Sequence, residues 1–271
     1  MAQVKLDYRH CDRMRPLYLR HAEVEDLAHQ VRSQLIDDAT RALSVDVLRG
    51  ISRLVVNEIA FDLFISVDAT VHDEQGEPVF GICEYDPGVP DTAMVCVSPI
   101  DGPYSEELTL STLAHELGHA TMDAPAWIAQ CRLGPGLFDN ATPTSAVAYR
   151  TTTRGLEHLA EPIRKSAEAL QSPEYFAELR ANEFMGSLLV PRGVLAEVIH
   201  EIAPAHGLII EHDPMLDLEH PTMSLCLPEL PRMLDPGADD FVCELAMVFG
   251  VTPRFIQVRL ERYGMTSARR H

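Results

Sequence analysis

The pentapeptide His-Glu-Leu-Gly-His occupies residues 115–119 and is the most informative stretch of the chain. In an α-helix, side chains four residues apart lie on one face, about one turn from each other. His115 and His119 can therefore direct imidazole nitrogens to one cation, about 2 Å from each nitrogen if the ion is zinc. Glu116 lies about 100° further round the helix and can reach a water beside that ion. These residues suit metal-assisted hydrolysis of an amide bond.

The surrounding residues predict a helix with two different faces. An apolar stripe, roughly opposite the histidines, consists of Leu110, Leu113, Ala114 and Leu117. Ser105, followed by two glutamates, is a suitable helix start, because a hydroxyl caps free N–H groups and acids favour the positive end of the helix dipole. Gly118 weakens the helix by up to about 1 kcal/mol. It also leaves room for another element to approach closely.

A tetrahedral catalytic zinc takes three protein ligands and a water, so a third ligand is needed. The extended motif with a third histidine is absent, because Met122 and Pro125 stand where its glycine and histidine would be. The third ligand must therefore come from a later segment. The best source is a helix predicted from Pro173 to Leu189, with Ser172 as its cap.

Glu178 is the preferred third ligand on this second helix. It shares a face with Met185 and Leu189. A carboxylate buried on such a face is costly unless it is paired or binds a metal. Glu174 competes with it, one turn earlier on the same face but nearer the solvated helix end. The lesser candidates are Glu157, His158 and Glu161.

Three segments together resemble the signature of the ImmA/IrrE metallopeptidases. Residues 113–120, 178–184 and 188–191 are similar to that family's H-E-x-x-H, E-x-x-A-N-x-F-A and L-L-M-P motifs. Two departures stand out. Met185 replaces the usual alanine, and the gap between the ligand helices is longer than in the family, so that an insertion over residues 124–172 must fold around or over the site.

The resemblance implies a zincin-like metallopeptidase fold with one zinc ion. In that fold His115, His119 and Glu178 ligate the ion, and Glu116 is the catalytic base. The resemblance also implies a substrate. Such proteins cleave a helix-turn-helix transcriptional repressor and so switch on stress-response or mobile-element genes.

Composition is typical of a globular protein, with 46% hydrophobic and 23% charged residues among 271. The net charge of −19 argues against nucleic-acid binding by the body of the protein. It suits a basic partner such as a DNA-binding repressor, although solubility explains it equally well. We expect no membrane partner and a cytoplasmic location, because no secretory signal or long apolar run is present and the six cysteines include no C-x-x-C pair.

The order of predicted elements favours an α+β fold in which helices flank a small sheet. Helical spacing predicts helices over 22–37 and 45–59, the second capped by Ser44. Apolar and polar residues alternate over 61–67, and short apolar runs at 79–85 and 94–98 predict two more strands. Residues 94–98 are our candidate for an edge strand that holds a substrate as an added strand.

The C-terminal end predicts a pair of helices over 238–249 and 253–263, separated by Gly250. This pair is typical of a helix-turn-helix. We expect a metallopeptidase domain over 1–237 and the helical pair over 238–271, packed on it. The arginines that make this end locally basic are Arg254, Arg259, Arg262, Arg269 and Arg270. They allow contact with DNA or a partner, which is the one place where we expect nucleic-acid binding.

Three functions remain open from the sequence. The leading hypothesis is a zinc endopeptidase that hydrolyses a peptide bond in a regulatory protein. The second is a zincin-like regulator that binds a repressor or DNA through its C-terminal helices without cutting it. The third, a small-molecule amidase, uses the same metal site. Glu116 favours an enzyme, because a purely structural metal site needs no carboxylate beside the first histidine.

Overall fold

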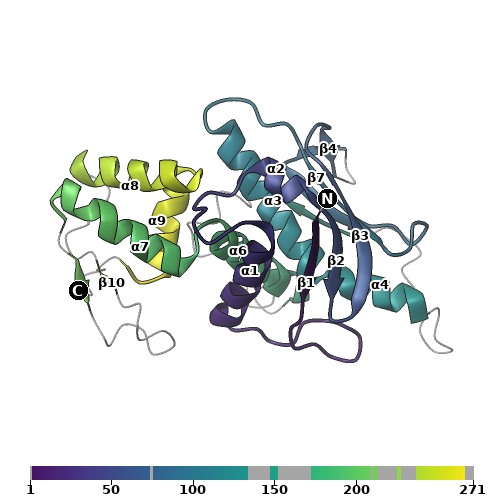
Figure 1. The fold of residues 1–271 in the computed structure, drawn as a ribbon. Helices are drawn as coiled ribbons and strands as arrows, with labels where there is room; N and C mark the ends of the chain where they lie inside the picture. Colours follow the sequence, from purple (N-terminus) through teal and green to yellow (C-terminus); the bar gives the residue numbers. More distant parts are fainter. Residues whose placement is uncertain are drawn as a thin grey trace. The chain divides into compact units, whose positions relative to one another are not determined.

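The computed structural model describes residues 2–73, 76–133, 147–151, 172–208, 210–212, 225–226 and 236–265. The chain forms two compact units, unit 1 over Met1–Leu188 and unit 2 over Leu189–His271 (Figure 1). This division differs from the domain boundary predicted after residue 237. The reason is that α7 (Arg192–Ile202), which the sequence analysis assigned to the peptidase domain, packs against α8 (Pro236–Phe249) within unit 2.

Unit 1 combines a mixed sheet with helices, which confirms the predicted α+β class. Its elements in chain order are β1 (Ala2–Leu6), α1 (His21–Leu35), α2 (Val45–Arg49), β2 (Ile51–Val56), β3 (Ile59–Ser66), β4 (Val71–His72), β5 (Pro78–Val79), β6 (Gly81–Tyr85), β7 (Thr92–Val97), α3 (Ser105–Met122), α4 (Ala124–Leu133), β8 (Val147–Thr151) and nearly all of α6 (Pro173–Leu189). The main sheet has six strands in the order β1-β2-β3-β7-β6-β8. Strands β1 and β2 pair in parallel, as do β3 and β7, and the other neighbours are antiparallel.

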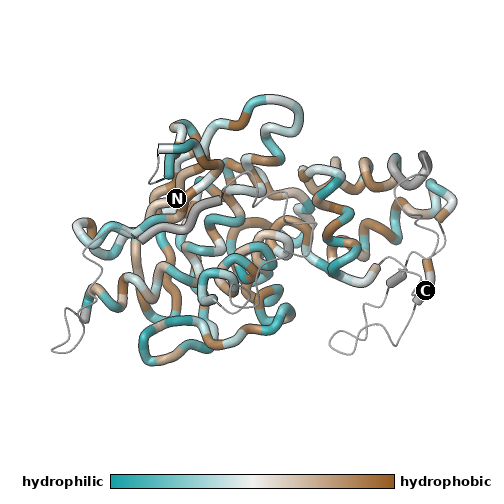
Figure 2. Tube along the Cα trace, turned by 180° about the vertical axis from the view of Figure 1, so that it is seen from behind, coloured by the Kyte–Doolittle hydropathy of each residue, from teal (hydrophilic) through white to brown (hydrophobic). Residues whose placement is uncertain are grey.

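The core of unit 1 lies between this sheet and the helices that pack on it. Helices α3 and α4 both contact β6, and α3 also contacts β7. Alternation along β3 matches the prediction, because Phe61 and Leu63 are buried whereas Phe64 is 61% exposed on the other face. Hydrophobic stretches, brown in Figure 2, follow the strands and the interior helices. The sheet therefore presents one face to the helix that carries the pentapeptide.

The helix predicted over 45–59 is wrong beyond Arg49. Ile51 already begins β2, and Asn57 and Glu58 form a turn with φ of 49° and 68°, from which β3 returns. Two central residues with positive φ are typical of a tight hairpin turn. Apolar residues over 51–56 match both a helix stripe and a buried strand. Parallel pairing with β1, an element the sequence analysis did not predict, selects the strand.

The prediction that residues 94–98 form an edge strand is also wrong. These residues belong mainly to β7, which lies between β3 and β6. Among the strands that the structure describes, the edges of the main sheet are β1 and β8. Strand β8 comes from the stretch 124–172, of which the structure describes α4, β8 and Ser172.

Unit 2 contains α7, a short 3-10 helix η2 (Ala203–His206), the paired strands β9 (Glu211–His212) and β10 (Leu225–Cys226), and then α8 and α9 (Pro253–Arg262). Helices α8 and α9 confirm the predicted pair, with Gly250 at φ 66° between them. The Thr252 hydroxyl accepts a hydrogen bond from the Phe255 N–H at 3.2 Å and caps α9. The helices bend by 96° at this break, which falls close to the angle of a helix-turn-helix.

Within the described residues, we find no individual helix with both the length and the hydropathy to cross a membrane. The bent pair Asp240–Phe249 and Pro253–Arg262 meets that test when taken together, by length and composition only.

Candidate metal centre

The centre forms where α3 and α6 cross. A Cβ on Gly118 would lie 3.0 Å from the Cα of Ala181, so the two helices meet backbone to backbone at this glycine. This confirms the expectation that Gly118 leaves room for another element. Helix α3 begins at Ser105 as predicted, but Tyr104, with φ of 63° and no side-chain cap, precedes it in place of the expected serine cap. Ser172 does cap α6, accepting from the Tyr175 N–H at 3.1 Å.

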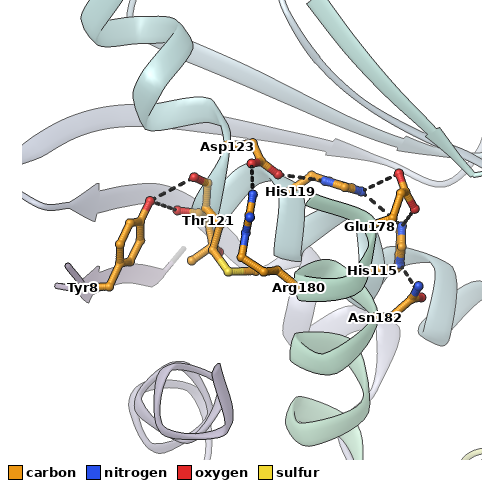
Figure 3. Close-up of polar contacts among 9 residues, drawn as sticks. Tyr8, His115, His119, Thr121, Asp123, Glu178, Arg180 and Asn182 are labelled. Atoms are coloured by element: carbon orange, nitrogen blue, oxygen red, sulfur yellow. Dashed lines mark hydrogen bonds and ion pairs between the residues drawn. The ribbon is translucent and has the colours of Figure 1, made fainter. Parts of the chain in front are cut away.

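The structure brings His115, His119 and Glu178 together (Figure 3). The two Nε2 atoms lie 3.2 Å apart. His115 Nε2 lies 3.4 Å from Oε2 of Glu178, and His119 Nε2 lies 3.4 Å from Oε1. Ligands about 2.0–2.1 Å from a tetrahedral zinc are about 3.3 Å from one another. Each of the three distances is thus close to that between two ligands of one zinc ion. Both histidines are buried, whereas the Glu178 side chain is 35% exposed, so that among the described residues the cluster is accessible from the Glu178 side.

The partners of the imidazoles explain why a cation suits this place. His115 Nδ1 lies 3.1 Å from the Asn182 side-chain oxygen, and His119 Nδ1 lies 2.9 Å from Asp123 Oδ2. Both partners are acceptors, which places the ring protons on the Nδ1 atoms and lone pairs on the Nε2 atoms. In the neutral rings, two lone pairs and a carboxylate then face one another. These residues could hold a metal ion, and the imidazole and carboxylate donors suit zinc.

A proton competes with the metal at this centre. Burial alone would lower the pKa of His119, but hydrogen bonds to Asp123 and Glu178 outweigh it and raise the pKa to about 10. Burial would raise the pKa of Glu178, but its contacts with both histidines hold the pKa well below the usual range. Metal ligation requires neutral imidazoles. Zinc must therefore displace the proton that the raised pKa of His119 favours, and its affinity is expected to rise with pH.

Asp123 and Arg180 together fix the orientation of the His119 imidazole. Asp123 accepts from His119 through one oxygen and from the Arg180 guanidinium through the other, at 2.9 Å each (Figure 3). Neither Asp123 nor Arg180 was predicted from the sequence as part of the site. Asp123 carried a usable signal, because it follows His119 by four residues and so lies one helical turn beyond it. Nothing in the sequence pointed to Arg180.

Tyr8 secures the end of α3 next to this pair. Its hydroxyl donates to the carbonyl oxygens of Thr121 and Met122, at 3.2 and 3.0 Å. Burial raises the pKa of the Tyr8 hydroxyl, with the Asp123 charge adding to the effect. The last carbonyls of a helix lack partners within the helix. Tyr8 supplies them with a buried donor and so holds the segment that carries Asp123.

Glu116 is fully buried on the side of α3 that faces β6. A Cβ on Gly81 of β6 would lie 2.8 Å from Glu116 Oε1 and 2.7 Å from Thr112 Cγ2. Only a residue without a side chain fits there. The predicted base thus lies outside the ligand set, on the helix face next to the two histidines, and β6 limits its position.

Glu174, the one competing ligand candidate among the described residues, is not part of this centre. Glu174 is exposed and lines a pocket of about 680 Å³ that includes none of the three ligands. The pocket also touches Asp123, Arg180 and Trp127. The other candidates, Glu157, His158 and Glu161, lie outside the described residues.

Replacing Asp123 by asparagine is expected to weaken zinc binding by about 10–100-fold, the usual cost of altering a group that orients a metal-bound histidine. Asparagine can still accept from His119, but it removes the charge that also holds Arg180. Zinc affinity is measured by competition with a chromophoric chelator. The matched control is Asp91→Asn, which removes an exposed carboxylate that also pairs with an arginine. Equal affinities for both variants would contradict the role given to Asp123.

Replacing Gly118 by alanine is expected to weaken zinc binding although alanine favours helices. The new methyl group would meet the backbone of Ala181, and overfilling such a contact costs about 1–3 kcal/mol. Helix α6 must shift, and Glu178, one turn before Ala181, shifts with it. The same chelator competition measures the effect. An affinity equal to or above that of the parent would show that the helix crossing does not set the position of Glu178.

Comparisons of the chain with protein-family models, with curated proteins and with solved structures find no match.

Proposed function

We propose that this chain is a zinc-dependent endopeptidase with a zincin-like fold that hydrolyses a peptide bond in a regulatory protein. One observation carries the proposal. Three side chains that could hold a metal ion lie at the spacing of zinc ligands, the third of them is partly exposed among the described residues, and a buried carboxylate lies on the neighbouring face of the helix that carries both histidines. A structural zinc site is closed by four protein ligands and needs no such carboxylate.

Each residue of the centre has a separate role in the proposed hydrolysis of a peptide bond. Zinc, when bound, polarises the scissile carbonyl and acidifies a water molecule. Glu116 takes the proton from the attacking water and later donates it to the nitrogen of the leaving amine. Asp123 and Asn182 keep the Nε2 atoms of His119 and His115 directed at the metal position.

The substrate class follows from charge and from the resemblance to the ImmA/IrrE metallopeptidases. The net charge of −19 favours encounter with a basic protein, and DNA-binding repressors carry basic surfaces. We therefore propose a helix-turn-helix transcriptional repressor as the substrate.

Incubation with candidate substrates tests this function. Zinc-loaded protein is mixed with purified basic helix-turn-helix regulators, and the fragments are identified by mass spectrometry. An acidic protein of similar size and a chelator-treated sample serve as controls. Discrete fragments that require zinc are expected from a regulator only. Fragments that persist after zinc removal, or none from any regulator, count against the proposal.

One observation favours the second candidate, a regulator that binds DNA without cutting a protein. The 96° bend between α8 and α9 resembles a helix-turn-helix. Arg259, however, is only 3% exposed and stacks over the Tyr263 ring at 4.2 Å, so it is not available to a phosphate. Arg269 and Arg270 lie outside the described residues. Fluorescence anisotropy with a labelled mixed-sequence duplex at low salt separates the two candidates.

A further inference from the structure

A pocket of about 680 Å³ lies beside the metal centre and includes none of its three ligands. The described residues that line it belong to unit 1 and come from the stretch before α1, the start of α1, the beginning of α4 and α6. Sites for small organic molecules have volumes of about 300–1,000 Å³ and are lined mainly by apolar and aromatic side chains. The apolar and aromatic side chains of this pocket include Leu17, Tyr18, Val24, Trp127, Phe176 and Leu179.

Helix α6 turns different faces to the pocket and to the metal position. Phe176, Arg180 and Glu183 line the pocket, and their spacing of four and three residues puts them on one face of the helix. Glu178 lies about 200° round the helix from Phe176, on nearly the opposite face. The pocket is therefore a separate site and not an extension of the metal centre.

The wall that the stretch before α1 supplies is held in place by hydrogen bonds. The Leu17 N–H donates to the Arg9 carbonyl oxygen at 3.0 Å, and the Arg9 guanidinium donates to the Tyr18 carbonyl oxygen at 3.0 Å. The same guanidinium pairs with Glu23 of α1 at 2.7 Å. A wall fixed in this way is preformed, as are the walls of most small-molecule sites.

Exposed hydrophobic side chains gather at this pocket. Leu17, Tyr18 and Phe176 are 45, 75 and 41% exposed, and they are three of the eight large hydrophobic residues that are exposed among the described residues. Such a concentration marks a binding site, whereas scattered exposed residues do not. Together with Trp127, two of these side chains give the pocket three aromatic rings, which attract organic cations through their π-electrons.

The charged residues of the pocket leave a negative balance. Arg15 and Glu174 are exposed and opposite in sign, so they offset each other and are screened by water. Arg180 and Asp123 offset each other as an ion pair at 2.9 Å. Glu183 adds a carboxylate whose side chain is only 5% exposed. Water screens such a charge weakly, so it favours a cationic ligand.

A cation in the pocket would bring an opposite charge to the surroundings of Glu183. The Ser187 hydroxyl donates to Glu183 Oε1 at 3.2 Å, and Nδ1 of His21 lies 3.6 Å from Oε2. The hydroxyl is neutral, and the His21 side chain is 69% exposed. Burial of a carboxylate is costly unless an opposite charge accompanies it. The ligand therefore gains from carrying its charge next to an apolar body.

One ion pair joins the pocket to the metal centre. Asp123 and Arg180 both line the pocket, and Asp123 accepts from Arg180 through one oxygen and from His119 through the other (Figure 3). A cation in the pocket competes with Arg180 and His119 for the negative charge of Asp123, and it also repels a zinc ion. Both effects oppose zinc binding, and by linkage zinc opposes binding of the cation by the same factor.

We propose that this pocket is a regulatory site for a small organic cation, a quaternary or protonated amine with an aromatic or aliphatic body, and that occupation of the pocket lowers the affinity for zinc. The regulation acts on the metal centre of the proposed peptidase, and in this respect it rests on the proposed function. Binding of the cation itself does not depend on peptide hydrolysis.

Titration with a model cation tests the ligand class. The probe is benzyltrimethylammonium, which has no lone pair with which to bind zinc, and binding to the full chain is followed by NMR of the probe. Benzylsulfonate has the same aromatic body and the opposite charge. About tenfold or more tighter binding is expected for the cation, the usual range for interactions with a charged group. Equal affinities, or tighter binding of the sulfonate, overturn the proposal.

Two pairs of variants distinguish this pocket from the negative surface of the protein as a whole. Phe176→Ala removes an exposed ring that lines the pocket, and Phe64→Ala removes an exposed ring of β3 that does not. Only the first is expected to weaken binding, by about fivefold. Glu183→Gln and Glu174→Gln change the net charge equally, but only the loss of the buried carboxylate should cost about tenfold or more. The phenylalanine pair alters exposed side chains and so does not depend on the Glu183 variant folding. Equal effects within the phenylalanine pair overturn the proposal.

Zinc affinity in the presence of the probe tests the regulatory link. Competition with a chromophoric chelator is measured with and without saturating benzyltrimethylammonium. The cation is expected to lower zinc affinity by about fivefold or more, and zinc should lower the affinity for the cation by the same factor. At a probe concentration that half-saturates the parent, Phe176→Ala should show a smaller effect on zinc. Unchanged zinc affinity in the parent overturns the regulatory link.

These measurements separate the pocket from the proposed peptidase function, because none of them requires hydrolysis. If the cation binds and lowers zinc affinity but no regulator is cut, the peptidase function fails and the regulatory site stands. If zinc-dependent cleavage is found and the Phe176→Ala protein binds the cation as the parent does, the peptidase function stands and the regulatory site fails.

Discussion

Replacing Glu116 by glutamine is expected to leave zinc bound and to lower peptide hydrolysis by about 10²–10⁴-fold, the usual contribution of a general base. Glutamine has nearly the same shape as glutamate and fits the space that Gly81 leaves. It cannot take a proton from water. The metal persists because Glu116 is not among the three side chains at the metal position. Zinc content by atomic emission and fragment formation by mass spectrometry measure the two properties on one sample.

Glu106→Gln is the matched control, because Glu106 lies on the same helix but is exposed. It should keep both zinc and activity. A Glu116→Gln protein that cuts a substrate as fast as the parent would show that another group acts as the base. A variant that loses zinc as well as activity would place Glu116 in the support of the metal.

Replacing Glu178 by glutamine is expected to reduce zinc affinity by more than the about 10–100-fold typical of changes outside the ligand set. The neutral amide removes the negative charge that faces the two imidazoles at 3.4 Å. The same change lowers the pKa of His119, because the hydrogen bond that its imidazole donates to the Glu178 carboxylate is one cause of the raised pKa. Chelator competition at several pH values measures the affinity, which should rise with pH in the parent.

Glu174→Gln serves as the control for Glu178. Glu174 is one turn earlier on α6 and was the rival ligand in the sequence, but it is exposed and lies outside the ligand cluster. Its replacement should leave zinc affinity unchanged. A larger loss from Glu174→Gln than from Glu178→Gln would mean that α6 turns differently when zinc is bound.

The ligand helices could be predicted from the sequence because their signals are local. Histidines four residues apart define one face of α3, and a serine–proline start defines α6. The three predicted ligands are brought together, and Gly118 lies at the helix crossing as expected.

The predictions from sequence fail where contacts between segments distant in the chain determine the structure. Ile51 and its neighbours match a helix stripe as well as a strand, and pairing with β3 on one side and with β1, far away in the sequence, on the other selects the strand. Residues 94–98 were predicted to form an edge strand, but β6 and β8 continue the sheet beyond β7. Arg180 contributes through a contact between two helices. No spacing along the chain encodes any of these pairings.

The position of Trp127 makes its intrinsic fluorescence a probe of the region next to the metal centre. It is the only tryptophan in the sequence, and it lies half-buried in the pocket wall that also includes Asp123 and Arg180. Excitation at wavelengths that only indole absorbs therefore reports on Trp127 alone. This residue lies four positions after Asp123, which orients His119. Zinc binding and removal can be followed in unlabelled protein through the wavelength of maximum emission and the intensity of the Trp127 fluorescence.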